Sequence, residues 1–397
     1  MLTRNGIEDF EIANLAPYAM KSRESWGRQY PEPDHGSRTA FQRDRDRVVH
    51  CEAFRKLEYK TQVFVIFEGD YYRTRLTHTI EVAQLARTIG RNLRLNEDLI
   101  EAVALAHDLG HPPFGHAGEM FLDRRLKEAG LGGFNHNQRS FEIVTKFEKR
   151  YPDFPGLNLT TEVLVGILKH ETLYDNIGDP AVLADKDFAA RLKSRPCSME
   201  AQVVDKADSL AYLNHDIDDG LTSGCITASD LEQSELWRRA VARIHRPGAV
   251  LTDTMFKYQV VKELIDMQVK DLLKATDSRI VDNGIRSAED LSRVQKGLVD
   301  FSDSMKQERE HIQLILNEKM YHHWRVERMT SKARRILNDL FDVYLDNPKQ
   351  LPYDVYDRSR KYSDRDLHDV ICNYLAAMTD RAALDDYKRL FEPYQKV

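Results

Sequence analysis

Four residues in three separate segments of this sequence carry side chains that bind divalent metal ions: His78, His107, Asp108 and Asp208. Imidazole and carboxylate together suit a hard to borderline cation, and three converging segments leave coordination positions open for water and substrate. His107 and Asp108 directly follow the apolar run LIEAVALA, where a buried helix is expected to end. Two adjacent polar groups there are costly to bury without partners. Either residue alone would more often be a core or capping residue, but the neighbouring motif favours a metal site.

That motif is the segment LGHPPFGHAGE at 109–119. Its dense glycine and proline predict a tight, non-helical turn that can hold side chains rigidly beside a metal. His116 and Glu119 are three positions apart, so they share a face if a helix restarts near Gly115. A histidine oriented by a carboxylate is a candidate general acid or base. A capped helix start would explain Glu119 but not the recurrence of histidine in this stretch.

A third element joins Asp208 to Tyr212 and Asp216 at four-residue spacing. At about 100° per residue in a helix, these three side chains form one stripe along one face. Asp208 would complete the metal shell, Tyr212 would bond a phosphate and Asp216 a sugar hydroxyl. A solvated acidic face is the competing interpretation, and the added polar groups His215 and Asp218 weaken it.

The elements that must position these residues are predicted to be mainly helical, because apolar residues recur three and four apart over most of the chain. The exception is a short β-hairpin, with strands at 61–67 and 71–76 around a turn at 68–70. Residues 1–36 carry Pro31, Pro33 and Gly36 and are interpreted as an N-terminal arm with little internal structure. Residues 37–220 form the predicted core, and 221–397 a helical C-terminal region that packs on it.

The composition excludes several classes of protein. The 397 residues are 42% hydrophobic, enough for a core, so a mainly disordered chain is excluded. Lys and Arg number 58 against 64 Asp and Glu, a net charge of −6, which argues against a surface made for coating nucleic acid. Four scattered cysteines suit a reducing compartment. No signal peptide or membrane helix is evident, so a soluble, cytoplasmic protein is expected, and no P-loop motif is present.

A local excess of positive charge precedes the first histidine. From Arg38 to Arg75 there are nine basic and six acidic residues, a balance of +3. Such a segment beside a metal site would focus an anionic substrate. The alternating signs of residues 43–47 are equally typical of a salt-bridged helix surface, which would account for about half of these arginines but not for Arg75.

Taken together, these motifs resemble a known family. His78, His107-Asp108 and Asp208 are similar to the ligand pattern of the HD superfamily of metal-dependent phosphohydrolases. Longer blocks, among them RLTHTIEVAQLAR, ALAHDLGHPPFGHAGE, VVDKADSLAYLNHDIDDGL and YLAAMTDRAAL, resemble the deoxyguanosinetriphosphate triphosphohydrolases and their bacterial homologues, over roughly residues 37–383. The resemblance implies a mainly α, HD-domain helical fold, here with one short β-hairpin and a helical C-terminal extension.

The resemblance also implies a reaction, in which a deoxynucleoside triphosphate and water give deoxynucleoside and intact triphosphate. His78, His107, Asp108 and Asp208 match the family's metal ligands, with Mn²⁺ or Mg²⁺ expected first and Fe²⁺ or Zn²⁺ as alternatives. His116 matches the family's catalytic histidine, and Glu119 its supporting acid. The residues that match phosphate-holding groups are Arg75, His111 and Tyr212. Gln62 and Asp216 match residues near the sugar 3′-hydroxyl, and His136 matches a second histidine beside the phosphate.

Beyond the dNTP substrate, the resemblance implies a homo-oligomer, a hexamer in many relatives, and leaves room for a nucleotide effector and for single-stranded DNA as further partners. Two alternatives to dNTP hydrolysis stay open. One is an HD-family phosphohydrolase acting on another nucleotide, which would give different products. The other is a nucleotide-sensing or single-stranded-DNA-binding HD protein, which should have lost metal ligands that this sequence retains.

Overall fold

The computed structural model describes residues 2–62, 73–170, 179, 183–245, 251–294, 297–359 and 364–396. Within these ranges the chain is helical and forms no strand, only isolated bridges such as Thr61 with Thr74. The predicted mainly α fold is therefore confirmed. Most of the predicted hairpin, residues 63–72, lies outside the described residues, and the flanking positions pair only through that single bridge.

The interpretation of residues 1–36 as an arm with little internal structure was wrong. Helix α1 (Arg4–Asn14) forms there, with the Thr3 side chain capping its N-terminus, and a short 3-10 turn η1 (Ser22–Glu24) follows. Glu11 on α1 is buried because its carboxylate accepts hydrogen bonds from the backbone and hydroxyl of Ser22. An acid that faces inward breaks the apolar pattern by which a helix is recognised in a sequence.

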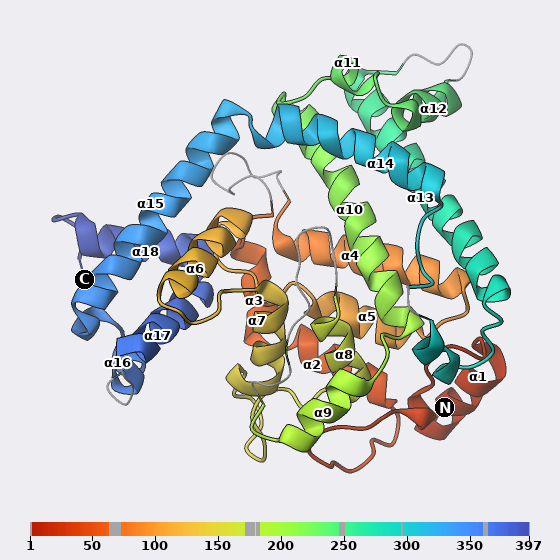
Figure 1. Ribbon diagram of the computed structural model, residues 1–397, viewed down its shortest axis with the longest axis horizontal. Helices are drawn as coiled ribbons and strands as arrows, with labels where there is room; N and C mark the ends of the chain where they lie inside the picture. The colour runs from red at the N-terminus through yellow and green to blue at the C-terminus, as the bar shows by residue number, and fades with distance from the viewer. Residues whose placement is uncertain are drawn as a thin grey trace.

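The predicted core is a bundle of helices in which α5 is buried on nearly every side (Figure 1). Its sequence between Leu99 and Ala106 is almost uniformly apolar, as expected for a helix with neighbours all round. The long helix α10 crosses α4 in front of it (Figure 1). The helices of this part are α2 (Ala40–Val49), α3 (Glu52–Lys56), α4 (Arg75–Asn92), α5 (Glu97–Ala106), α6 (Gly115–Glu128), α7 (His136–Glu142), α8 (Thr161–Leu168), α9 (Lys186–Ser194) and α10 (Met199–Ser223).

The C-terminal helices form an arch over this bundle, and those after residue 323 come down beside α6, far from the N-terminus (Figure 1). Leu122 and Phe121 of α6 pack into one hydrophobic cluster with Leu337, Phe341 and Leu375 of the C-terminal region. The helices of the region are α11 (Ala228–Leu231), α12 (Glu235–Ile244), α13 (Asp253–Asp282), α14 (Asp303–Leu316), α15 (Trp324–Asp346), α16 (Tyr353–Ser359), α17 (Asp364–Ala376) and α18 (Asp380–Phe391). The predicted domain boundaries at 36 and 220 stay predictions.

Short 3-10 and π segments connect these helices. They are the 3-10 turns η2 (Leu57–Tyr59), η6 (Glu289–Arg293) and η8 (Pro348–Gln350) and the π segments η4 (Ile143–Phe147) and η7 (Asn317–Tyr321). None of the described helices combines the length and apolarity that crossing a lipid bilayer requires.

Candidate active site

Three helices deliver the predicted metal ligands to one place. Thr74 caps the N-terminus of α4, which puts His78 in the first turns of that helix. His107 ends α5, and Asp208 lies in the middle of α10. Ligand atoms of His78, His107 and Asp208 lie within 4.8 Å of one another, and all three residues are buried. The structure thus brings together residues that are 29 or more positions apart in the sequence.

Asp108, the fourth predicted ligand, lies at the edge of this group. Its Oδ1 is 3.5 Å from Nε2 of His107 and 3.0 Å from Nε2 of His111, while its Oδ2 accepts a hydrogen bond from Nη1 of Arg75 at 3.1 Å. The same carboxylate therefore contacts one of the clustered ligands, His107, and two predicted phosphate-binding residues, His111 and Arg75.

The ring nitrogen of His107 that carries the proton indicates whether these residues can bind a metal ion. Its Nδ1 donates to the carbonyl oxygen of Ala104 at 2.6 Å, so in the neutral ring Nε2 carries the lone pair. That Nε2 is buried without a hydrogen-bond partner and lies 3.5 and 3.7 Å from the carboxylates of Asp108 and Asp208. A lone pair facing two carboxylates in a buried site calls for a cation between them. A divalent ion fits this demand, and His/Asp ligands match its chemistry.

The electrostatics of the carboxylates agree with this geometry. Burial raises the pKa of Asp208, but the nearby imidazoles of His107, His170 and His78 lower it further, so the net pKa is well below the ordinary value. Burial likewise raises the pKa of Asp108, and His107 and Arg75 reverse that shift to a strongly lowered pKa. Both groups therefore stay ionised, as ligands of a cation must.

The predicted histidines beside the phosphate form a second group. The rings of His111 and His136 stack with centroids 3.7 Å apart. Oε1 of Glu119 lies 2.8 Å from Nδ1 of His136, and Oε2 lies 3.9 Å from Nδ1 of His111. Burial, Arg75 and His136 lower the pKa of His111 to about 3, so its ring is neutral. The pKa of Glu119 is strongly lowered because its contacts with His136 outweigh its burial.

The turn before α6 positions the predicted catalytic histidine. Phe114 adopts a left-handed conformation at φ 63°, and α6 begins at the next residue, which places the exposed His116 in the first turn of α6. Gly110 is required because a Cβ there would come within 2.1 Å of the His136 carbonyl oxygen. The carboxylate of Glu119 lies against His136, and its predicted pairing with His116 stays a prediction.

The predicted sugar-binding residues are buried near the C-terminal region. Asp216 is fully buried, accepts a hydrogen bond from the hydroxyl of Tyr321, and leaves its Oδ1 without a partner. Gln62 is also buried, and its Oε1 has no partner among the described residues. Tyr212 is partly buried on the same helix as Asp216. Two unpartnered buried acceptors suit a ligand that donates hydrogen bonds.

Sequence reasoning left three contributing residues unassigned. His170 lies between Asp205 and Asp208, with Nε2 3.4 Å from Oδ2 of Asp208. Nδ1 of His215 lies 3.2 Å from Nδ1 of His78. His215 was noted only for local polarity, and Tyr321 gave no signal because its partner Asp216 lies 105 positions away in the sequence.

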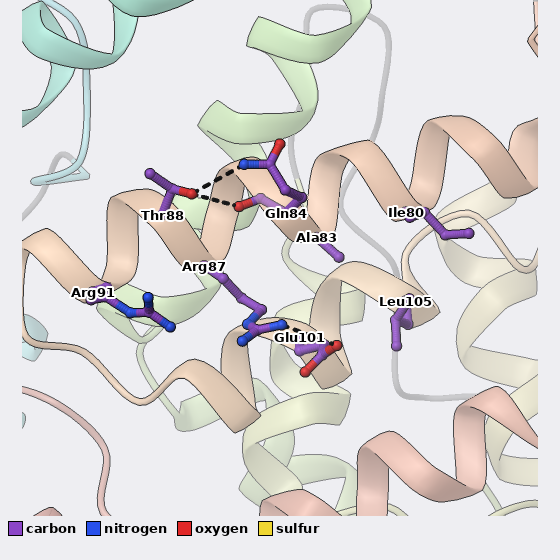
Figure 2. Close-up of a pocket in the computed structure, with 8 residues that line it drawn as sticks. All are labelled: Ile80, Ala83, Gln84, Arg87, Thr88, Arg91, Glu101 and Leu105. Atoms are coloured by element: carbon purple, nitrogen blue, oxygen red, sulfur yellow. Dashed lines mark hydrogen bonds and ion pairs between the residues drawn. The ribbon is translucent and has the colours of Figure 1, made fainter.

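A separate hollow of about 340 Å³ opens on the outer face of α4 and α5 (Figure 2). Arg87 and Glu101 form an ion pair within it, and Gln84 bonds to Thr88. None of its lining residues belongs to the predicted site, so this hollow is distinct from the candidate active site.

Comparison with known proteins points to the same part of the chain as the candidate active site. Residues 75–213 match the model of the HD domain and residues 299–389 that of the phosphohydrolase-associated domain. A deoxyguanosinetriphosphate triphosphohydrolase-like protein of Geobacter sulfurreducens is 47% identical over 401 residues, with 100% of both chains covered. Proteins of the same description from Geobacter metallireducens and Caulobacter sp. are 47% and 42% identical, covering 98% and 95% of this chain and 97% and 96% of theirs.

The matched HD segment contains the buried histidine and aspartate cluster, and the relatives align over nearly their whole length. The chain therefore belongs to the family of deoxyguanosinetriphosphate triphosphohydrolase-like proteins, which are HD-domain phosphohydrolases.

Proposed function

We propose that this protein hydrolyses a deoxynucleoside triphosphate, dGTP or several dNTPs, to deoxynucleoside and inorganic triphosphate in a metal-dependent reaction. The observation that carries the proposal is the position of Asp108, between the buried cluster of His78, His107 and Asp208 and the guanidinium of Arg75. A metal ion beside an arginine is a common arrangement for binding phosphoryl groups. The names of the relatives give the substrate class.

The predicted ligands His78, His107, Asp108 and Asp208 would hold the divalent ion, which supplies Lewis-acid polarisation of a phosphoryl oxygen. Arg75 has an unpartnered, buried Nε besides its bond to Asp108, so it retains donor capacity for phosphate oxygens. His116, in the exposed first turn of α6, would hold or move a proton at the 5′-oxygen. Gln62 and Asp216 offer buried oxygens to a sugar hydroxyl.

The test is incubation of the purified protein with each dNTP and Mn²⁺ or Mg²⁺, with products separated by chromatography. Deoxynucleoside and triphosphate are expected, and diphosphate or monophosphate products would instead point to HD chemistry on another bond. His116→Ala should lose roughly 10²-fold or more in kcat, the usual contribution of a general acid or base, and keep its metal. His245→Ala, at an exposed histidine that ends α12, a helix without any predicted site residue, is the matched control and should be fully active.

Absence of turnover with every dNTP, alone or in pairs, would contradict the proposal and favour the nucleotide-sensing or single-stranded-DNA-binding alternative. The remaining expectations about partners are a nucleotide effector, single-stranded DNA and assembly into a homo-oligomer. They stay predictions that nucleotide titration and light scattering would test.

A further inference from the structure

The junction between α17 and α18, residues 373–380, touches the candidate active site at several points although it lies in the C-terminal region. The C-terminal cluster with α6 explains why these helices lie nearby, but the polar contacts at the junction are more specific than packing requires. They centre on Asp380, the first residue of α18, which is 1% exposed.

The carboxylate of Asp380 connects two separate segments of the site. Its Oδ1 accepts a hydrogen bond from the backbone N–H of Phe114 at 2.8 Å. Its Oδ2 accepts one from the backbone N–H of Thr61 at 3.0 Å and another from the Thr61 hydroxyl. Both oxygens are therefore used by groups 319 and 266 positions away in the sequence.

Each of the two segments ends in a predicted site residue. Thr61 immediately precedes Gln62, and Phe114 precedes the helix that carries His116. Phe114 has a left-handed backbone conformation that is unfavourable for an aromatic residue, so an external contact must hold it. A Cβ on Gly115 would lie 3.3 Å from the Gln62 carbonyl oxygen, which shows how closely the two segments approach.

Neighbouring contacts extend the same connection. The buried ammonium of Lys60 donates to the carbonyl oxygens of His111 and, at 3.4 Å, of Ala376. The guanidinium of Arg139 on α7 donates to the backbone and side-chain oxygens of Asn373. The α17–α18 junction is thus hydrogen-bonded to the segments that carry Gln62 and His136. It is linked to His111 through Lys60, which donates to both.

We propose that Asp380 is a positioning residue for the hydrolysis, holding the 111–116 turn and the 61–62 segment in the register that the reaction needs. The inference rests on the proposed function. Asp380 does not contact His78, His107 or Asp208 in the described structure, so it acts on the substrate-binding and proton-transfer side of the site and not on metal binding. This gives the phosphohydrolase-associated segment a role inside the active site.

Asp380→Asn tests the proposal with almost no change in volume. Asparagine has one acceptor and one NH₂ group, so it can serve Phe114 or Thr61 but must face the other N–H with its own donors. Because a misplacement of about 1 Å can cost roughly 10²-fold in rate, kcat should fall at least tenfold while the Mn²⁺ dissociation constant changes less than about threefold. Thr61→Val removes only the hydroxyl contact, and its kcat should lie between those of wild type and Asp380→Asn.

Asp386→Asn is the matched control, because Asp386 lies on the same helix and accepts a hydrogen bond from the hydroxyl of Tyr344, away from the site. It should keep the wild-type kcat. Equal losses of kcat in both variants, or a loss of Mn²⁺ affinity in Asp380→Asn, would overturn the proposal because either would indicate general destabilisation.

Hydrogen–deuterium exchange tests the contacts of Asp380 independently of whether the protein hydrolyses dNTPs. Peptides containing Thr61 and Phe114 should exchange faster in Asp380→Asn than in wild type, whether or not any dNTP is hydrolysed. Unchanged exchange would overturn the connection itself. Faster exchange with an unchanged kcat in an active wild type would overturn the positioning role, whereas an inactive wild type would count against the proposed function alone.

Discussion

In most of the histidines of the site, one ring nitrogen contacts a neighbouring group. That contact orients the ring and so determines where the other nitrogen points. Nδ1 of His107 bonds to a backbone carbonyl, and Nδ1 of His136 bonds to Glu119. Nδ1 of His78 meets His215, whose Nε2 in turn contacts the carboxylate of Glu81. With Nδ1 occupied, Nε2 of His78 faces Asp208 at 2.9 Å. Such outer contacts fix the tautomer of a metal ligand.

Removing this support should weaken metal binding without removing a ligand. His215→Leu deletes the acceptor for Nδ1 of His78, and we expect the Mn²⁺ dissociation constant to rise roughly 10- to 100-fold, the usual effect of losing such a contact. His215→Asn keeps an oxygen acceptor near the same place and should be affected less. Isothermal titration of Mn²⁺ measures both. Equal affinity in wild type and His215→Leu would show that the orientation of His78 does not depend on His215.

At the scale of elements, α10 combines the predicted metal ligand Asp208 with a buried anchor at its start. Glu200 in its first turn is fully buried, and Oε1 accepts hydrogen bonds from the backbone N–H groups of Met20 and Asn96. These contacts join α10 to the N-terminal segment and to the cap of α5. Burial raises the pKa of Glu200 to about 7, although its hydrogen bonds and Lys21 oppose the shift.

The raised pKa predicts a pH dependence of folding. The folded state binds the Glu200 proton more tightly than the unfolded state, so this stability is fully present below the unfolded pKa of about 4.5 and is lost as pH rises through about 7. The loss is on the order of 3 kcal/mol, at about 1.4 kcal/mol per pKa unit.

Glu200→Gln keeps the acceptor oxygen and cannot ionise. Its free energy of unfolding relative to wild type should therefore increase between pH 5 and pH 8, measured by urea denaturation at each pH. Glu24→Gln, at an exposed glutamate, is the control and should show no such trend. A difference for Glu200→Gln that stays constant with pH would contradict the assigned protonation.

At the scale of the whole molecule, two regions of the chain contribute residues to the candidate site. The buried cluster of predicted metal ligands belongs to the bundle of α4, α5 and α10, whereas the turn that carries His116 packs between that bundle and the C-terminal helices. The two matched family segments, 75–213 and 299–389, correspond to this division. Tyr321 and Asp380 both reach the site from the second segment, so hydrolysis should require both.

The predicted metal site also implies that the melting temperature of the whole protein depends on the metal ion. A cation that binds only the folded state stabilises it by roughly 2.7 kcal/mol at a free concentration 100 times its dissociation constant. Chelation should therefore lower the melting temperature in scanning calorimetry, and added Mn²⁺ should restore it. Asp208→Asn should melt at the same temperature with or without Mn²⁺. A wild type insensitive to both chelator and Mn²⁺ would contradict the metal site.

The sequence by itself determined the local features of this protein. Helix periodicity depends on residues within about four positions of one another, and it predicted the mainly helical fold. The pattern of His78, His107-Asp108 and Asp208, with its resemblance to a known family, predicted that these side chains converge. The same local view failed at α1, because the buried carboxylate of Glu11 interrupts the apolar pattern and is explained only by Ser22.

Tertiary structure alone decided which polar groups meet. Asp380 bonds to Thr61 and Phe114, Tyr321 bonds to Asp216, and Glu119 lies against His136 because packing brings distant helices together. A buried polar group must find some partner, but the sequence does not specify which one. That choice follows from the shape of the packed core, to which residues throughout the chain contribute at once.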